Sequence, residues 1–174
     1  MNRKTTLSPP PLTLLDKYHG QETQTLYSTT VTVTGGDAGH GRASGVARSD
    51  DGQLSVELRL PKALSGPGGG TNPEQLFAAG YAACFHGALS PLAARAAIPI
   101  PGARVDVTVD FSRVPTDGLF VLTAHTRVRL PGVERTVAEE LVRNTERFCP
   151  YTKMARQGIA NVVALVLPDD VSES

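Results

Sequence analysis

The chain has 174 residues, which is the size of one domain or of one subunit of a small oligomer. Hydrophobic residues make up 40% and charged residues 20% of it, so we expect a folded domain with a packed core rather than a disordered chain. The 17 basic residues balance the 17 acidic ones, and this neutral balance argues against nucleic acid or an anionic membrane as a partner.

The two cysteines, Cys84 and Cys149, are too few for a disulfide-stapled secreted scaffold or a four-thiolate zinc site, but they are enough for a redox pair. Prolines at positions 9–11 interrupt the N-terminal region where a secretory signal would need a continuous apolar stretch, so we expect a cytoplasmic protein. Residues 75–94 carry no charge and have the length of a membrane span. Their Ala, Gly and polar content instead favours a helix buried in protein.

Residues 1–24 are predicted to be an N-terminal extension, because a proline-rich opening forms neither a helix nor a central strand. From residue 25 polar and apolar positions alternate and β-branched residues dominate, which predicts a strand that ends in a glycine-rich loop. Residues 46–60 predict two more strands around a turn at Asp51 and Gly52. The first third of the folded domain should therefore be a β-meander.

A well-formed helix start follows the second glycine-rich loop. Asn72 is a favourable N-cap, Pro73 suits the first helical position, and Glu74 faces the positive end of the helix dipole. The helix should run to about Ser90, with a kink or an end at Pro91, which has no N–H for the helical hydrogen bonds.

The rest of the chain predicts a hairpin, two helices and a strand. Residues 104–114 and 119–130 alternate as two paired strands, and residues 133–148 have the spacing of an amphipathic helix. A short helix over 150–158 and a final buried strand over 161–168 complete the pattern. Strands and helices do not alternate regularly, so the fold class is α+β with a largely antiparallel sheet.

Cys84 lies in the middle of the first predicted helix. Burial among Ala and Gly raises the pKa of a thiol and leaves it unreactive, so a reactive Cys84 needs a cation. His86 is two positions away and faces nearly the opposite side of the helix. We expect instead an arginine of the first glycine-rich loop, Arg42 or Arg48, held by a carboxylate such as Glu74. Glu74 could equally serve the helix dipole alone.

Cys149 stands at a helix break, because Pro150 disfavours α geometry for the residue before it. A thiol at the start of a short helix with room to move has the properties of a resolving cysteine. A metal site made of Cys84, His86 and Cys149 competes with this interpretation, but the divergent directions of Cys84 and His86 argue against it.

The segment TNPEQLFAAGYAACFHGAL, residues 71–89, resembles the signature helix of the organic hydroperoxide resistance proteins, a branch of the OsmC superfamily. The similarity extends from about residue 26 to residue 167 and includes VTVTGG, SDDG, GPGGG, LPG and CPYTKMARQG. It implies an OsmC-like fold in which a largely antiparallel sheet wraps around a central buried helix, in an intertwined homodimer. Residues 25–168 would form this domain, and residues 169–174 would be a tail.

The resemblance also implies a thiol peroxidase in which Cys84 is the peroxidatic and Cys149 the resolving cysteine, with Glu74 and a loop arginine holding the thiolate ready. The family usually places this arginine directly after TGG, whereas this chain has several more residues there. Arg42 matches best if GDAGH is an insertion, and Arg48 is the alternative.

The expected substrates are alkyl or lipid hydroperoxides, with apolar walls drawn from four aromatic residues: Phe77, Tyr81, Phe85 and Phe111. The resemblance points to no bound cofactor and no metal, and to an external dithiol as reductant, namely dihydrolipoyl groups on a protein carrier. Two other hypotheses remain open: a non-catalytic redox-sensing or ligand-binding member of the same fold, and a structural protein with two buried thiols.

Overall fold

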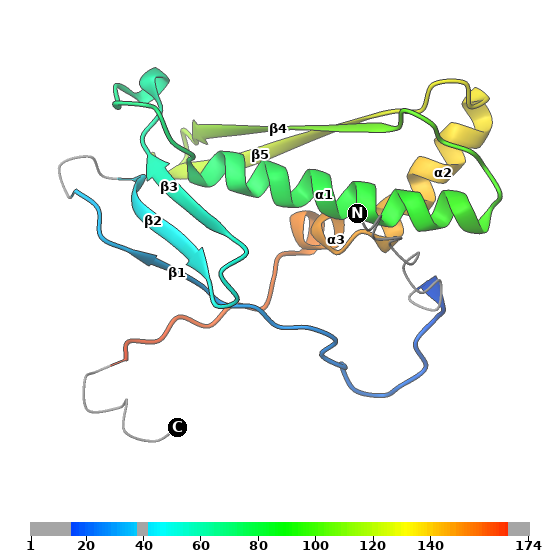
Figure 1. Ribbon diagram of the computed structural model, residues 1–174, viewed down its shortest axis with the longest axis horizontal. Coiled ribbons are helices and arrows are strands. Elements are labelled where there is room, and N and C mark those ends of the chain that lie inside the picture. Colours follow the sequence, from blue (N-terminus) through cyan, green and yellow to red (C-terminus); the bar gives the residue numbers. More distant parts are fainter. Residues whose placement is uncertain (1–14, 38–41, 167–174) are drawn as a thin grey trace, which may run out of the picture.

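The structure is a computed structural model that describes residues 15–37 and 42–166. Figure 1 shows a long helix, α1 (Pro73–Arg95), with a two-stranded hairpin along one side and two shorter helices against it, while a three-stranded sheet stands near its N-terminal end. This arrangement confirms the predicted α+β class with antiparallel strand pairing.

The three-stranded sheet is formed by β1 (Val31–Thr34), β2 (Ser44–Ser49) and β3 (Ser55–Arg59) in that order. The predicted turn at Asp51 and Gly52 joins β2 to β3, and Gly52 has a φ of 72°, a conformation that glycine adopts without strain. The first strand is shorter than predicted, because residues 25–30 belong to no strand.

The α1 helix begins as predicted, since the Asn72 side chain accepts a hydrogen bond of 2.9 Å from the Gln75 N–H. It does not end near Ser90 but continues through Pro91 to Arg95. The side chain of Ser90 donates to the His86 carbonyl at 3.0 Å, a bond that often accompanies local bending of a helix. The short helix η3 (Lys62–Leu64) precedes α1 in the second loop.

The hairpin of β4 (Arg104–Arg113) and β5 (Phe120–Arg129) is paired over all ten positions and packs along α1 (Figure 1). Helices α2 (Arg135–Phe148) and α3 (Pro150–Gln157) also contact α1. Two buried clusters hold these elements together: Tyr81, Phe85 and Cys149 in one, and Leu89, Ala93 and Leu141 in the other.

The opposite face of α1 remains exposed in the single chain and carries small residues, including Ala79, Ala83 and Gly87. The predicted burial of this helix therefore holds for one face only. The prediction of a buried strand over residues 161–168 is wrong for the residues described up to 166, since they form no strand and Val162 and Val163 are 91% and 89% exposed. An extended segment needs a neighbouring strand for its backbone hydrogen bonds, and this segment finds none within the described chain.

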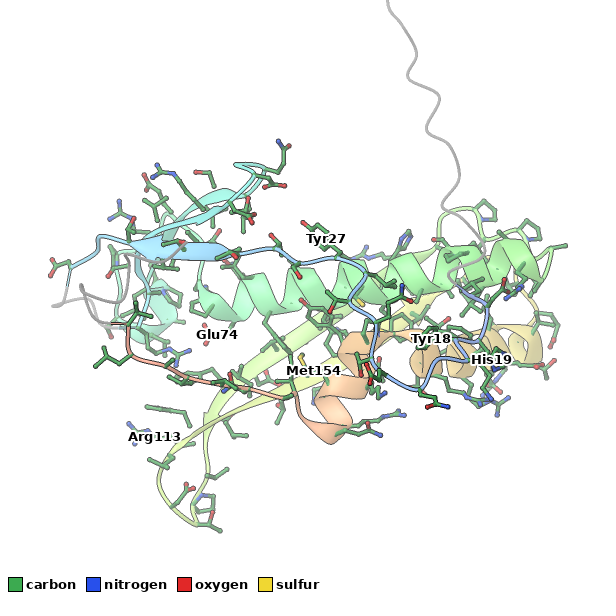
Figure 2. All side chains as sticks on the ribbon, turned by 90° about the horizontal axis from the view of Figure 1, so that it is seen from below. Tyr18, His19, Tyr27, Glu74, Arg113 and Met154 are labelled. Carbon is green, nitrogen blue, oxygen red and sulfur yellow. The ribbon has the colours of Figure 1, made fainter. Side chains whose placement is uncertain are left out.

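The N-terminal segment, residues 15–30, is attached at both ends. Leu15 is buried, and Asp16 forms an ion pair with Arg95 at the C-terminal end of α1. At the other end, Thr29 and Thr30 hydrogen-bond the Asp50 carboxylate at 3.3 Å. Figure 1 shows the chain between these anchors running apart from α1, and Figure 2 labels Tyr18, His19 and Tyr27 along its course. The predicted boundaries of the extension, the domain and the tail remain predictions.

Candidate active site

The fold brings the two cysteines together although 65 positions separate them. Their sulfur atoms lie 3.5 Å apart, within hydrogen-bond distance, and both are free thiols. Cys84 comes from the middle of α1, and Cys149 from the junction where α2 ends and α3 begins. Cys149 is fully buried, while Cys84 is partly exposed. Since a disulfide needs a sulfur separation of about 2.05 Å, an approach of roughly 1.5 Å would join them.

Close packing between α1 and α3 sets this geometry. The Tyr81 hydroxyl donates to the Thr152 hydroxyl at 3.3 Å, and the ring of Tyr151 packs against the rings of Phe77 and Tyr81. Gly80 permits the approach, because a Cβ at that position would lie only 2.9 Å from the Tyr151 hydroxyl oxygen. Helix α3 can therefore place its first residues directly over α1.

Two opposing effects act on the Cys84 thiol. Burial is the larger one and raises its pKa above the ordinary value, and the neighbouring Cys149 raises it further. A hydrogen bond from the backbone N–H of Tyr151 lowers the pKa, because it stabilises the thiolate. This N–H is free to donate to Cys84 because it belongs to the first turn of α3, where no helical carbonyl is available to it.

A second cluster lies at the N-terminal end of α1. Arg42 forms an ion pair with Glu74, and its guanidinium carbon lies 3.6 Å from the ring centre of Phe111. Figure 2 labels Glu74 beside the first turn of α1. Arg48 instead sits in β2 opposite Thr32. Arg42 is therefore the loop arginine that meets Glu74, as its alignment with the family pattern implied.

Arg42 and Glu74 do not lie at the Cys84 of their own chain. Ten residues of helix separate Glu74 from Cys84, which at 1.5 Å per residue is about 15 Å along the axis. In agreement with this distance, the groups that shift the Cys84 pKa include Tyr151 and Cys149 but no arginine. The four expected residues thus form two separate pairs in one chain.

A groove with a volume of about 470 Å³ opens between α1, β5 and α3, and its walls combine aromatic rings with polar side chains such as Thr123, Thr126 and Arg156. Three of the four residues predicted as substrate walls line this groove, namely Phe77, Tyr81 and Phe85, whereas Phe111 lies with Arg42 outside it. Their role toward a substrate stays a prediction. An ion pair of 3.3 Å between Arg156 and Glu146, which both line the groove, links α3 to α2.

The metal interpretation finds no support in the part of the chain that the structure describes, where no three His, Cys, Asp or Glu side chains gather at one point. His86 is exposed on α1, whereas Cys149 is buried.

Sequence reasoning missed three features that shape the site. They are the Tyr151 N–H that bonds Cys84, the close approach of α3 at Gly80, and the contact of Phe111 with Arg42. The Tyr151 N–H could have been found, because Pro150 marks the start of a helix whose first N–H groups lack partners.

Comparison with known proteins places this chain in a family. A model of the family described as OsmC-like protein matches residues 66–162. The chain belongs to this OsmC-like family, and within it the similar proteins are organic hydroperoxide resistance proteins. That of Xanthomonas axonopodis pv. citri is 40% identical over 136 residues, which cover 77% of this chain and 90% of the relative.

Solved structures agree. The organic hydroperoxide resistance protein OhrB of Bacillus subtilis has a TM-score of 0.66 and 39% identity, over 76% of this chain and 93% of that one. An organic hydroperoxide resistance protein from Legionella pneumophila has a TM-score of 0.68 and 36% identity, over 78% of this chain and 93% of that one.

Among the described residues, α1 is long and apolar enough to cross a bilayer, with a mean hydropathy of 1.3, but in the OsmC-type fold it is the central core helix. The family and fold that the sequence pattern implied are therefore confirmed, together with a place in organic hydroperoxide resistance.

Proposed function

We propose that this protein is a thiol-dependent peroxidase that reduces alkyl or lipid hydroperoxides to alcohols. The observation that carries the proposal is the 3.5 Å separation of the Cys84 and Cys149 sulfur atoms, in a chain similar to organic hydroperoxide resistance proteins. The partly exposed thiol, Cys84, is the one that a substrate can reach, and the buried thiol, Cys149, is the one that can only meet a neighbouring sulfur. Cys84 is therefore the peroxidatic residue and Cys149 the resolving one.

The reaction begins when the Cys84 thiolate attacks the distal oxygen of the hydroperoxide. The O–O bond breaks, the alkoxide takes up a proton and leaves as an alcohol, and Cys84 becomes a sulfenic acid. The Cys149 thiolate then attacks the Cys84 sulfur, the disulfide forms, and the hydroxyl leaves with a proton as water. An external dithiol, which we propose to be a dihydrolipoyl group on a protein carrier, returns both cysteines to thiols and is itself oxidised to a disulfide. No bound cofactor is needed in this cycle.

The groove between α1, β5 and α3 carries aromatic side chains that support the choice of organic over inorganic peroxide. Its walls include Phe77 and Phe85, and Phe85 packs in the same buried cluster as Cys149. An alkyl chain gains free energy by leaving water for such a groove, whereas hydrogen peroxide has no apolar surface to bury.

The positive charge at Cys84 would come from a second subunit. Within one chain the Arg42 and Glu74 pair lies too far from Cys84, yet a thiol with a pKa raised by burial needs a cation to ionise. The small-residue face of α1 and the exposed apolar residues Val162 to Val166 are surfaces that a second copy would cover. We therefore place the enzyme in a cytoplasmic homodimer in which Arg42 and Glu74 of one subunit serve Cys84 of the other.

Single cysteine variants test the reaction. Cys84→Ser should abolish consumption of cumene hydroperoxide, while Cys149→Ser should complete one turnover and leave a sulfenic acid that dimedone traps. Consumption at the normal rate by Cys84→Ser would refute the proposal. A wild-type protein that stops after one equivalent of peroxide, with excess dihydrolipoamide present, would indicate a redox sensor instead. Replacing the lipoyl dithiol by thioredoxin measures the preference for the reductant. Replacing cumene hydroperoxide by hydrogen peroxide measures the preference for the substrate.

Mixed dimers test the assignment across subunits. Cys84→Ser alone should be inactive and Arg42→Ala alone about a hundredfold slower than the wild type, but heterodimers of the two variants should regain one site made of a normal Arg42 and a normal Cys84. A mixture that forms heterodimers but gains no activity over Arg42→Ala would show that the arginine does not act across the interface.

A further inference from the structure

Four side chains form a continuous stack at the turn end of the β4–β5 hairpin, which we call the hairpin stack: Arg42, Phe111, Phe120 and Arg113. The Arg42 guanidinium carbon lies 3.6 Å from the centre of the Phe111 ring. The rings of Phe111 and Phe120 are stacked with centres 4.7 Å apart, and the Arg113 guanidinium lies 4.6 Å from the centre of Phe120. Figure 2 labels Arg113 near the end of the hairpin.

The strand register explains why these residues stack. Phe120 pairs with Arg113 and Leu122 pairs with Phe111, and side chains two positions apart on a strand point to the same face. Phe111, Arg113 and Phe120 therefore share one face of the hairpin, and the diagonal neighbours Phe111 and Phe120 are within reach of each other. Arg42 reaches this face from the loop before β2.

Both faces of the Phe111 ring are occupied. A guanidinium at 3.6 Å and a second ring at 4.7 Å cannot share one face, so Arg42 lies on one side and Phe120 on the other. Little of either ring face is left for a substrate, and Phe111 is not among the residues that line the groove between α1, β5 and α3.

The two contacts of Arg42 restrain it in different ways. The Glu74 carboxylate holds one edge of the guanidinium through N–H donors, which fixes its direction but uses donors. The Phe111 ring fixes the plane of the guanidinium by cation–π attraction and uses none of the N–H groups. An arginine held in this way keeps its remaining donors in the plane, available to a thiolate or a peroxide oxygen.

We propose that Phe111 is a positioning residue that orients the Arg42 guanidinium beside Glu74 for the reaction at the peroxidatic cysteine, with Phe120 supporting the ring from behind. This inference rests on the proposed peroxidase function. It assigns to Phe111 a role different from the substrate wall that the sequence suggested. The aromatic face is the essential property, so other aromatic residues should replace Phe111 better than an aliphatic residue of similar volume.

The test compares Phe111→Leu, Phe111→Tyr and Phe120→Leu in the full-length protein. Phe111→Leu should lower the second-order rate constant for cumene hydroperoxide roughly three- to thirtyfold, the range expected for loss of one cation–π contact. It should also move the pH profile of Cys84 alkylation by iodoacetamide to higher pH. Phe111→Tyr should restore both quantities. Phe120→Leu should move the alkylation profile in the same direction as Phe111→Leu but by less, because it loosens the Phe111 ring without removing it.

A double-variant comparison separates positioning from packing. Loss of Arg42 removes what Phe111 positions, so Arg42→Ala with Phe111→Leu should be no slower than Arg42→Ala alone. Additive losses would overturn the inference, and so would equal rates for Phe111→Leu and Phe111→Tyr or an unchanged alkylation profile in Phe111→Leu. Alkylation needs no turnover, so it still decides the role of Phe111 if the wild-type protein fails to reduce peroxides and the proposed function is wrong.

Discussion

Replacement of Gly80 by alanine should disturb the cysteine pair from a distance. The new Cβ would lie 2.9 Å from the Tyr151 hydroxyl oxygen, whereas ordinary contacts begin near 3.4 Å, so Tyr151 must retreat by at least about 0.5 Å. The ring cannot swing freely, because Phe77 and Tyr81 pack against it with centres 6.2 and 5.8 Å away. The displacement should therefore pass to the backbone of α3.

Stability and reactivity should both report this displacement. Overpacking in a well-packed site costs about 1–3 kcal/mol, and alanine in a helix interior recovers about 1 kcal/mol relative to glycine. We thus expect the free energy of unfolding to fall by about 0–2 kcal/mol. The Tyr151 N–H that stabilises the Cys84 thiolate should move away, so the Cys84 pKa should rise.

Urea denaturation and the pH profile of iodoacetamide alkylation measure the two effects, and Tyr151→Phe provides the control. Phe at position 151 removes the atom in closest contact and leaves the ring carbon at 3.3 Å, so it should relieve much of the damage in the Gly80→Ala background. The reasoning is refuted if Gly80→Ala gains the full helical stabilisation and keeps the wild-type alkylation profile, or if Tyr151→Phe relieves nothing.

Further predictions concern charge. Arg42→Ala should slow formation of the sulfenic acid by about a hundredfold or more, as loss of one electrostatic donor usually does, and stopped-flow kinetics should show no comparable loss in Arg48→Ala. Without Arg42, burial is the largest effect on the Cys84 thiol and outweighs the Tyr151 N–H, so the pKa stays raised. The native state then keeps the proton after the unfolded state has lost it, so the free energy of unfolding of Arg42→Ala should fall as pH rises past the ordinary value of 9.0. Urea denaturation at about pH 8 and about pH 10 should show a smaller fall in the wild type. Asp16→Asn should lower the free energy of unfolding by less than about 1 kcal/mol in the same assay, because its ion pair with Arg95 is exposed, and a larger loss would give the N-terminal segment a structural role.

The sequence predicted correctly those features that depend on residues close together along the chain. The Asn72 cap is one such feature, the ten-residue hairpin is another, and the helix break at Cys149 is a third. In each case the deciding interaction spans a few residues or a simple alternation. Residue chemistry suggested that Glu74 holds either Arg42 or Arg48, and only the family pattern favoured Arg42, since 32 positions separate it from Glu74.

What the sequence could not predict depends on contacts between distant elements. Residues 161–166 have the composition of a strand, but a strand forms only where a neighbouring backbone accepts and donates hydrogen bonds. Pro91 carries a strong local tendency to end a helix, and the buried Leu89 and Ala93 on either side of it outweigh that tendency through packing. From the sequence alone, Phe111 is indistinguishable from any other apolar strand residue, because nothing near it in the sequence indicates that Arg42 covers its ring.

Cys149 is the whole of the connection between α2 and α3, so the inner thiol has no linker of its own. Its N–H donates to the Thr145 carbonyl at 2.9 Å, and its carbonyl accepts from the Lys153 N–H at 3.2 Å, which ties its backbone into both helices. Any shift of the main chain would have to carry the eight residues of α3 with it, whereas rotation about the side-chain bond moves the sulfur alone. Reduced and oxidised molecules should therefore differ by a rotamer rather than by a rearranged backbone, and each catalytic cycle would start again from an almost unchanged scaffold.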